Sequence, residues 1–532
     1  MKNNIMKKAY RGVIFILLMI GFMFFPSCEK DFGDINNSYD AKLYEANMPG
    51  LFNGLVGSLK KTGTHYRIPV AWLYQWNQQA AMFSVSGYRL DDYTTQPWQN
   101  LYTAMANAND LEAMIAEEEN PENFKNILAM VKTIMAYKAL AATLLYDDMP
   151  YSEAGRGFVN TDGFRPAYDS QQSIMEAALT DLSWAVDNFS NSDSQEKLEG
   201  ADVLLGNDID KWRKFANSLR FRYAMAIVEK DASFANPIIT AALSKPLLAP
   251  EEYVSLDPAT IANLQNNREG YFRGNSYVRM GSTMFESMSS TDAVDGSGIY
   301  DLRCSILWEP NEDDEWVPYP QVPGNNTATV TGNPYSRNRT KDAGRWANDR
   351  SNFAAINTYY VNERSIPQIV ISGSEISFIK AELYNRGIAV GVNQAMAESF
   401  YLEGITASVN YWHALANSIS VWVVNKPDAV PDPADLTAML TDVNVAYAAD
   451  ATVALNQIYK QSWISLFHQP FKSWDLQRRT GATPGVSLPS NGLVVDFNSL
   501  TYPPSERETN RVNWTAITGG NDSEKDKIWI HK

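Results

Sequence analysis

The chain has 532 residues, of which 45% are hydrophobic and 20% charged, and its 61 Asp and Glu against 45 Lys and Arg give a net charge of −16 at pH 7. A chain of this length can bury a large core and divides into two or three lobes. The acidic balance argues against a nucleic-acid partner, because neutralising phosphate groups requires clustered Lys and Arg.

The N-terminal segment has the pattern of an export signal. Three basic residues precede an unbroken apolar run at 13–25, which ends just before Cys28. A positive flank, a short apolar core and a small residue before the cut are typical of a secretory signal, and the run is shorter than the roughly 20 residues that a helix needs to span a bilayer. Cys28 at the cut predicts a bacterial lipoprotein, cleaved before this residue and acylated on it. The alternative is an ordinary secreted protein in which the cysteine stands there by chance.

Removal of residues 1–27 from the 532 leaves 505 residues, and because these 27 carry four basic residues and no acid, the charge changes from −16 to −20. Such an acidic body is repelled by an anionic membrane surface, so a lipid on Cys28 would hold it there. Once Cys28 is acylated, Cys304 is the one remaining cysteine, and no intrachain disulfide can form.

From residue 40 onward, most of the sequence has helical periodicity, with apolar residues three and four positions apart. Short polar breaks separate neighbouring runs, as expected for helical hairpins. The sequence has no strict 34-residue repeat, so a regular solenoid is not supported. The expected fold is therefore all-α, built from irregular helix pairs. The predicted helical runs are 102–116, 124–135, 174–186, 212–227, 376–383, 395–413 and 451–467.

Periodicity fades where Gly, Asn, Pro, Asp and Arg alternate with aromatic residues, at 246–367 and again at 66–98. Loops this long in a folded protein are usually functional or disordered, and their aromatic content argues against disorder. The expected organisation is a signal peptide (1–27), a polar tether (28–40), a helical-pair scaffold (41–245) containing the aromatic loop 66–98, a loop-rich lobe (246–367), a second helical-pair scaffold (368–479) and C-terminal loops (480–532).

Several segments, taken in order, resemble one family: the SusD/RagB nutrient-binding outer-membrane lipoproteins of Bacteroidetes, in their second SusD-like branch. The strongest single match is DKWRKFANSLR at 210–220, and one departure is Leu302, which stands where the family usually has Pro. The other matching segments are CEKDFGDIN (28–36), LYDDMPYSEA (145–154), PAYDSQ (166–171), DLR (301–303), the acidic helix 375–387, GITAS (404–408), QSWISLF (461–467), RRTG (478–481) and YPPSE (502–506).

The resemblance implies an all-α fold of tetratricopeptide-like helix pairs with a loop-rich ligand-binding lobe. It also implies a partner, a SusC-like TonB-dependent outer-membrane transporter over which the protein sits as a lid, and a lipid-anchored position on the outer membrane that faces the exterior. The motifs themselves are mostly architectural. Trp212, Phe215 and Leu219 share one helix face and are expected in the core. Four arginines near acidic stretches are expected to tie helices together: Arg220, Arg222, Arg478 and Arg479.

Patterns of known catalytic chemistry are scarce. The four histidines lie far apart in the sequence, and none belongs to an H-E-x-x-H pattern or lies beside a cysteine pair. There is no G-x-S-x-G elbow and no phosphate-binding loop. We therefore expect no catalytic residue, no metal and no cofactor.

Binding has better candidates, because exposed Trp and Tyr rings suit the apolar C–H faces of sugars, and peptides use the same kind of anchor. For each candidate, structural packing is the alternative to ligand contact. The predicted ligand-binding residues are Trp76, Tyr88, Trp98, Trp308, Trp316 and Trp346, with Arg89, Asp91 and Asn100 as polar neighbours.

The sequence thus predicts a surface lipoprotein that captures an oligosaccharide, or a peptide, and passes it to a transporter without making or breaking a bond. Two alternatives remain open. A helical glycoside hydrolase would also be long, α-rich and aromatic, and a structural or assembly lipoprotein would bind a membrane partner but no small ligand.

Replacing Cys28 with Ala tests the anchor. Without the acylated thiol, the acidic body has no means of staying on the membrane, so the variant should move from the membrane fraction to the soluble one. Fractionation with immunodetection measures this, with Cys304→Ala as the matched control that should remain membrane-bound. A Cys28→Ala protein that still needs detergent for extraction would contradict the lipoprotein interpretation.

Overall fold

The computed structural model describes residues 47–61, 67–82, 93–155, 165–261, 264, 272, 278–321, 329–335, 340–342, 345–347, 351–362, 365–419, 426–481 and 497–532. The chain divides into two units, 1–47 and 48–532, and every element named below belongs to the second. The predicted signal and Cys28 lie outside the described residues.

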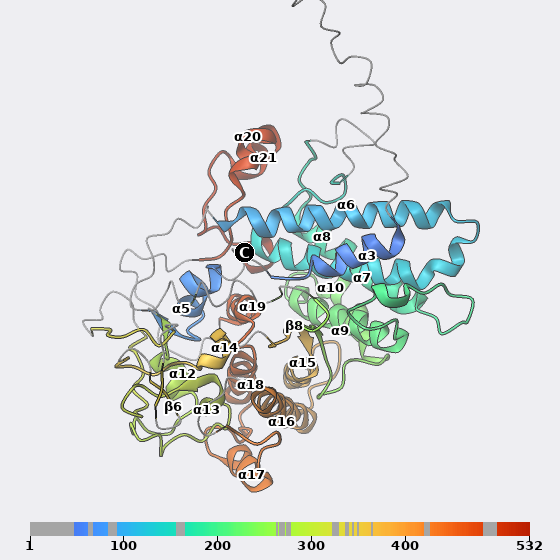
Figure 1. Cartoon of the computed structure of the whole chain (residues 1–532). Helices are drawn as coiled ribbons and strands as arrows, with labels where there is room; N and C mark the ends of the chain where they lie inside the picture. Colours follow the sequence, from blue (N-terminus) through green and yellow to red (C-terminus); the bar gives the residue numbers. More distant parts are fainter. Residues whose placement is uncertain are drawn as a thin grey trace, which may run out of the picture. The chain divides into compact units, whose positions relative to one another are not determined.

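The first half of this unit is a series of helices in which each packs against the next, α6 on α7, α7 on α8, α8 on α9 and α9 on α10. In Figure 1, α6 runs across the view along the upper edge of this group. Their bounds are α3 Met48–Gly57, α5 Tyr74–Trp76, α6 Thr95–Glu117, α7 Lys125–Tyr146, α8 Gln171–Asn188, α9 Ile209–Ile227 and α10 Ala232–Leu243, with a π-helical turn at Pro69–Leu73 and 3-10 turns at Pro121–Phe124 and Glu199–Ala201.

The second half has its own helical group, in which α15 packs against α16 and α18. These helices are seen nearly along their axes in Figure 1, so they run in a different direction from α6. The bounds are α15 Gly373–Arg386, α16 Gln394–Ser418, α17 Pro433–Thr441, α18 Ala451–Ser465, α19 Pro470–Thr480, α20 Pro504–Thr509 and α21 Arg511–Thr518, with a 3-10 turn at Trp529–His531.

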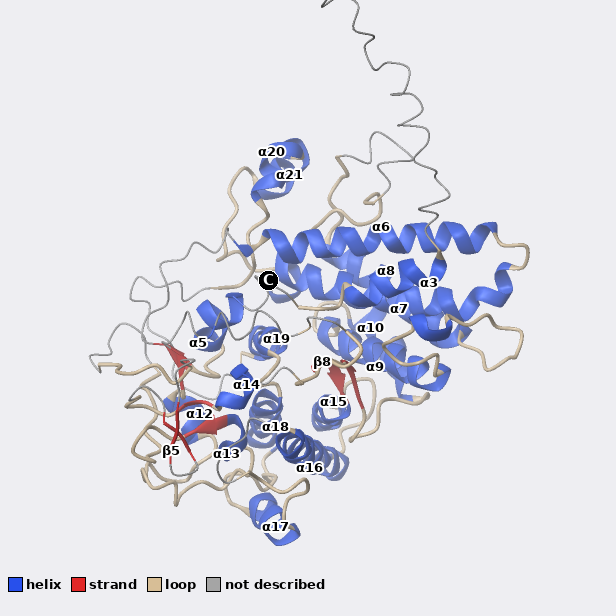
Figure 2. Cartoon of the chain, viewed as in Figure 1, coloured by secondary structure: helices blue, strands red, loops and turns tan. Residues whose placement is uncertain are grey.

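Between these groups lie short helices and paired strands, and loops predominate (Figure 2). The described strands form four two-stranded antiparallel ribbons. The short helices are α12 Ser282–Glu286, α13 Cys304–Leu307 and α14 Thr358–Asn362. The ribbons are β1 Ala81–Met82 with β3 Val278–Arg279, β2 Tyr253–Leu256 with β8 Gln368–Ser372, β4 Trp308–Glu309 with β7 Ala355–Ile356, and β5 Thr340–Asp342 with β6 Arg345–Ala347.

Local sequence sets many helix ends. Short polar side chains accept a hydrogen bond from the backbone N–H two or three residues further on, as N-caps do. At the other end, Gly387 follows α15 with φ 71°, a left-handed conformation in which a side chain would be strained. The capping residues are Ser170, Asp208, Asp231, Ser372, Asn393, Asp432 and Asp450.

Apolar helix faces supply the core. Trp212, Phe215 and Leu219 of α9 are fully buried, which confirms their predicted packing role. The segment Pro121–Tyr146 is long and apolar enough to span a membrane, but 72% of its most apolar stretch is buried inside the protein, as in a core helix. At the α15–α16 contact, a Cβ on Gly404 would lie 2.9 Å from the ring of Phe378, so only glycine allows this approach.

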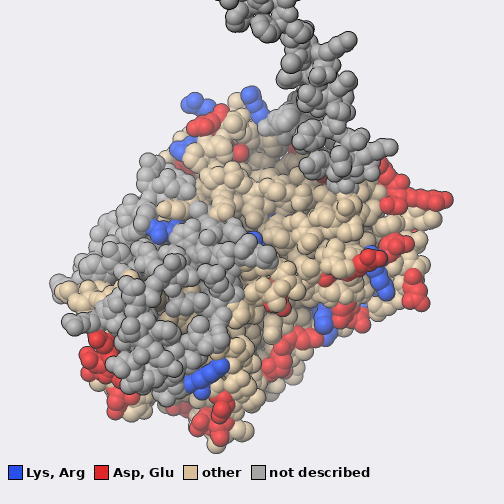
Figure 3. All heavy atoms as spheres, in the orientation of Figure 1, with Lys and Arg blue, Asp and Glu red and all other residues tan. Residues whose placement is uncertain are grey.

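On the face shown in Figure 3, acidic side chains gather along the lower and right margins.

Three sequence motifs that are far apart meet at one buried arginine. Arg303 and Asp301 are fully buried, and Arg303 donates to both carboxylate oxygens of Asp301, at 2.9 and 2.6 Å. The same guanidinium donates to Ser408 on α16 and to Gln461 on α18. The backbone N–H of Arg303 also donates to Asp301, so the turn closes with Leu302 in place of the usual proline. This network ties the loop-rich region to the second helical group.

Three other motifs meet beside α6. The backbone N–H of Gln171 donates to the carboxylate of Asp148 at 2.8 Å, and the hydroxyl of Tyr502 donates to the backbone oxygen of Asp148 at 2.7 Å. Tyr168 donates to Glu506 at 2.7 Å, which joins the segment before α8 to α20. The motifs at 145–154, 166–171 and 502–506 are therefore architectural, as the sequence suggested.

The predicted all-α class and its helix pairs are confirmed, and a helix lies at each of the seven predicted runs, although α18 ends at Ser465, before the predicted end at 467. The structure extends them, for example from 124–135 to the end of α7 at Tyr146. Periodicity alone did not predict α3, α10, α17 or the helices of the C-terminal region, and packing against the larger groups accounts for such short elements.

Candidate functional site

Three of the predicted ligand-binding tryptophans are packed in the core. Trp308 is fully buried against Phe467, with ring centroids 4.9 Å apart, and Trp76 is 7% exposed with Phe497 at 3.9 Å. Trp98 is 4% exposed within a cluster that includes Tyr146 and Tyr502. These rings offer almost no face to a ligand in this conformation. The sequence left core packing open as the alternative to ligand contact for each of them, and all three are packed in the core.

Trp316 differs, because its ring is only partly buried at the edge of the core cluster that contains Trp308. Its backbone N–H donates to the oxygen of Val294 at 2.7 Å, which places it beside the turn with Asp295 and Gly296. A Cβ on Gly296 would lie 2.7 Å from the indole, so this glycine allows the turn to cover one side of the ring. Asp295 is exposed next to it. An indole beside a carboxylate is an arrangement that a sugar can use.

The remaining predicted residues are only partly located. Trp346 belongs to β6, opposite Lys341 of β5, although only its backbone is described. Tyr88, Arg89 and Asp91 lie outside the described residues. The structure therefore does not test whether these residues and Trp316 share one surface.

Asn100 lies in a cavity that opens between α3, α6, α7, β8 and α19. We call it the basic cavity, because four lysines line it. Its empty volume is about 820 Å³, the open mouth included. It is lined by Ser58, Leu59, Lys60, Lys61, Pro97, Asn100, Leu101, Tyr137, Lys138, Ala141, Ala142, Leu145, Ile369, Val370, Gln469, Phe471, Lys472 and Asp475.

Lys138 is the most deeply buried of these lysines, with 9% of the residue exposed. Its ammonium donates to the backbone oxygen of Ser58 at 2.9 Å and to the amide oxygen of Asn100, and both acceptors are neutral. Burial lowers the pKa of Lys138 from 10.5 to about 7, since the charged form has left water without gaining a carboxylate. Asn100 is thus bound to a buried lysine.

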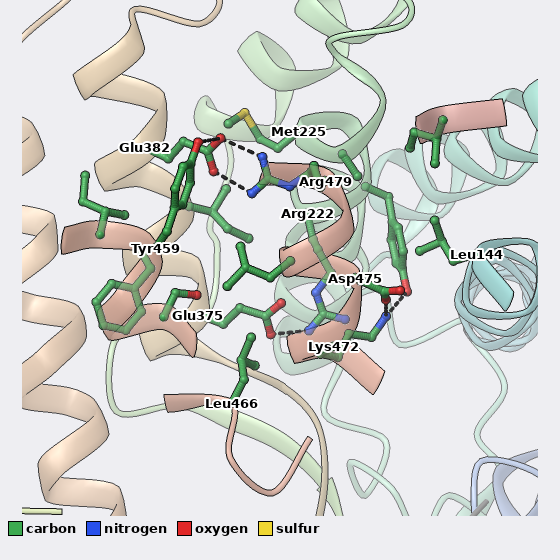
Figure 4. A pocket seen from close by; sticks show the side chains of 18 of the residues that line it. Leu144, Arg222, Met225, Glu375, Glu382, Tyr459, Leu466, Lys472, Asp475 and Arg479 are labelled. Atoms are coloured by element: carbon green, nitrogen blue, oxygen red, sulfur yellow. Dashed lines mark hydrogen bonds and ion pairs between the residues drawn. The ribbon is translucent and has the colours of Figure 1, made fainter. Parts of the chain in front are cut away.

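A second cavity, of about 730 Å³, lies on the other side of Lys472 and Asp475, which line both. Figure 4 shows its ion pairs: Arg222 with Glu375 at 2.5 Å, and Arg479 with both carboxylate oxygens of Glu382 at 2.7 Å. Burial alone would raise the pKa of Glu382, but Arg479 and Arg386 more than offset it and lower the pKa below its usual value. We call it the ion-pair cavity.

The arrangement of the ion-pair cavity favours a structural role. Arg222 and Arg479 tie their helices to carboxylates of α15, as the sequence predicted, and Arg478 pairs with Asp475 of its own helix while donating to the backbone oxygen of Leu144 on α7. Arg220 bonds to Asn217 within its own helix. Because Arg479 and Arg386 hold Glu382 ionised, this carboxyl is not poised as a general acid. Among the residues that the structure describes, no group of three His, Cys, Asp or Glu side chains could hold a metal ion.

The comparisons with known proteins bear on the whole chain. A sequence model of the SusD-like family, described as "Starch-binding associating with outer membrane", matches residues 42–492. The chain belongs to this family. The search of curated proteins gave no match.

Solved structures share the fold. A chitin-binding protein is 22% identical with a TM-score of 0.69, covering 91% of this chain and 100% of its own. A SusD homologue from Parabacteroides distasonis is 18% identical with a TM-score of 0.69, covering 92% and 98%. A chitin-binding SusD homologue from Flavobacterium johnsoniae is 18% identical with a TM-score of 0.62, covering 91% and 98%. At these identities the likeness establishes the fold.

The lysines of the basic cavity were not among the residues predicted from the sequence. The one available signal was Lys138 itself, a charged residue within an otherwise apolar stretch of α7. Lys61 and Lys472 carry no such signal, because their meeting depends on how α3, α19 and β8 pack.

Replacing Lys138 with Met tests the cost of this buried charge. The side chain titrates near 10.5 when unfolded and about 7 when folded, so between these values the unfolded state binds more protons and stability rises with pH. Between pH 7 and pH 10, the wild type should therefore gain about 1–3 kcal/mol of unfolding free energy relative to the variant. Urea unfolding at both pH values measures this gain.

Lys132→Met is the matched control on the same helix, since the side chain of Lys132 is 23% exposed and pairs with Asp181 at 2.7 Å. Its stability difference from the wild type should stay level over this pH range. If the difference in unfolding free energy between the wild type and Lys138→Met also stays constant over this pH range, the pKa of Lys138 is not lowered in the folded protein.

Proposed function

We propose that the protein is a lipid-anchored nutrient-binding protein of the outer-membrane surface, which captures an oligosaccharide and delivers it to a SusC-like TonB-dependent transporter. The observation that carries this proposal is the match of residues 42–492 to a family described as starch-binding and associated with the outer membrane. The pattern around Cys28 and the chitin-binding names of two structural neighbours support it. No bond of the ligand is made or broken.

Within this proposal, the ligand surface lies on the loop-rich lobe around Trp316. Its partly exposed indole and the exposed Asp295 supply an apolar ring face and a hydrogen-bond acceptor for sugar hydroxyls. We include Trp346, Tyr88, Arg89 and Asp91 from their sequence pattern, with Trp316 as the described member of the set. Trp76, Trp98 and Trp308 support the fold behind such a surface, because they are buried.

Replacing Trp316 and Trp346 together with Ala tests the surface. Buried or stacked tryptophans often contribute more than 1 kcal/mol each to binding, and about 1.4 kcal/mol corresponds to a tenfold change in Kd. The double variant should therefore bind starch or chitin oligosaccharides roughly tenfold or more weakly in calorimetry, with unchanged helicity by circular dichroism.

Trp184→Ala is the matched control, because this partly buried tryptophan lies on α8 and packs beside Lys132. Its affinity should equal that of the wild type. If the Trp316 and Trp346 double variant binds with the same affinity as the wild type, the ligand does not bind at this surface. Release of shorter sugars from a bound glycan would favour the glycoside hydrolase instead, and a flat response to starch, chitin and peptide pools would favour an assembly lipoprotein.

The transporter partner has a separate test. Purification of the native lipid-anchored protein in mild detergent should recover a large β-barrel protein in a stable complex, identified by mass spectrometry. An unrelated outer-membrane lipoprotein, purified in the same way, is the control. Repeated recovery of the protein alone would contradict the role as a transporter lid while leaving glycan binding unaffected.

A further inference from the structure

The basic cavity collects positive charge inside an acidic protein. Acidic residues outnumber basic ones by 16 over the chain, and acidic groups dominate the margins of the face in Figure 3. Yet the described lining of this cavity holds four lysines and one carboxylate, Asp475. The local charge of the cavity lining is therefore positive, opposite in sign to the net charge of the chain.

The single carboxylate does not neutralise Lys61, Lys138 and Lys472 together. Asp475 accepts from Lys472 at 3.2 Å, but it also accepts from Arg478 at 2.6 Å, so its charge is already shared between two cations. Within the described part of the chain, Lys61 and Lys138 form no ion pair. The backbone N–H of Lys61 donates to Gln368 at 2.7 Å, which fixes its segment against β8 and holds the side chain at the cavity wall. Burying cations without a counter-charge is costly, so the arrangement calls for an explanation.

A second observation points the same way from the adjoining ion-pair cavity. Arg222 is 6% exposed, and only its Nη2 has partners, Glu375 and the backbone oxygen of Val370. Its Nε and Nη1 are buried without a hydrogen-bond partner in the described structure. Arg222 lines the ion-pair cavity and not the basic cavity, so it contributes to the basic cavity through its positive charge. Arg222 is close enough to Lys61 and Lys472 to act on both electrostatically.

We propose that the basic cavity is a binding site for an oxyanion, a carboxylate or sulfate group carried by a small molecule, with Lys61, Lys138 and Lys472 as its donors and Arg222 adding positive potential from the adjoining cavity. An oxyanion supplies several acceptor lone pairs, and hydrogen bonds between ionised groups are about twice as strong as neutral ones. The empty volume of about 820 Å³ falls within the range of small-molecule sites. Tyr137, Asn100 and Gln469 provide further polar atoms in the wall.

This site is separate from the proposed glycan surface. Its walls are α3, α6, α7, β8 and α19, whereas Trp316 lies on the loop-rich lobe. The inference therefore does not depend on which nutrient the lobe binds. It assigns the cavity to an acidic ligand, either an acidic sugar or a free inorganic anion.

The site should also respond to pH. Burial, Lys472 and Arg222 lower the pKa of Lys61 to about 8, with Asp475 opposing them, and burial lowers that of Lys138 to about 7. A bound anion favours the charged amines, so binding takes up protons and affinity should rise as pH falls from 9 to 6. Burial raises the pKa of Tyr137, and Tyr223 and Asp475 raise that of Lys472 in spite of its burial, so both groups retain their protons over this range.

The test is calorimetry on the whole mature chain at constant ionic strength, at pH 6 and pH 9, with sodium glucuronate and sodium sulfate as probes. Glucose is the neutral control and sodium chloride the ionic one. We expect at least one oxyanion to bind, at least fivefold more tightly at pH 6, and glucose at the same concentration to give no such signal. Binding of glucuronate alone identifies an acidic sugar as the ligand class, and binding of sulfate identifies a free anion.

Lys61→Gln and Lys138→Met should each weaken this binding at least tenfold, whereas Lys132→Met should leave it unchanged. Lys61→Gln is the safer variant, because Lys61 is less buried than Lys138 and should fold normally. If neither oxyanion binds more tightly than chloride, or if both cavity variants bind as the wild type does, the proposal is overturned. The Trp316 and Trp346 double variant should retain oxyanion binding, which separates this site from the glycan surface.

Discussion

The packing of the helices depends on α15 and its two buried carboxylates, Glu375 and Glu382, which lie seven residues apart. Each meets an arginine from another helix, Arg222 of α9 for the first and Arg479 of α19 for the second. Removing one member of such a buried pair leaves an uncompensated charge, which costs about 3–5 kcal/mol. The Arg222–Glu375 pair therefore fixes how the first helical group meets the second, and the Arg479–Glu382 pair holds α19 against α15 within the second group. Displacing either arginine-bearing helix would break its ion pair with α15 and leave a buried carboxylate without a counter-charge.

That constraint also explains where the cavities lie. The position of α19, which brings Arg478 and Arg479 toward carboxylates, also makes its Lys472 line both cavities. The charge of Asp475 is shared between Lys472 and Arg478. The ion-pair cavity is balanced and holds helices together. The basic cavity keeps an excess of positive charge, which is the basis for assigning it a ligand. The loop-rich lobe, where we propose the glycan surface, is tied to α16 and α18 by Arg303 through a separate network.

Sequence reasoning was strongest where the signal was local and repeated. The periodicity of Trp212, Phe215 and Leu219 predicted a buried helix face because neighbours three and four residues apart share a face in any α-helix. The resemblance also predicted that distant motifs were architectural, and Arg303, Ser408 and Gln461 meet accordingly. Reasoning was weakest for single aromatic residues. Trp308 and Trp316 stand eight residues apart in similar loop sequence, yet one is fully buried and the other partly exposed.

The sequence by itself determined the helical class, the family, the lipoprotein pattern at Cys28 and the acidic character of the chain, because each is carried by composition, periodicity or contiguous motifs. Only the tertiary structure decided which tryptophans face solvent and which lysines converge. Burial of a ring and the meeting of Lys61, Lys138 and Lys472 depend on contacts between segments that are up to about 400 residues apart. No local pattern encodes such distances, since the same residue types serve equally well as core, surface or site until the helices have packed.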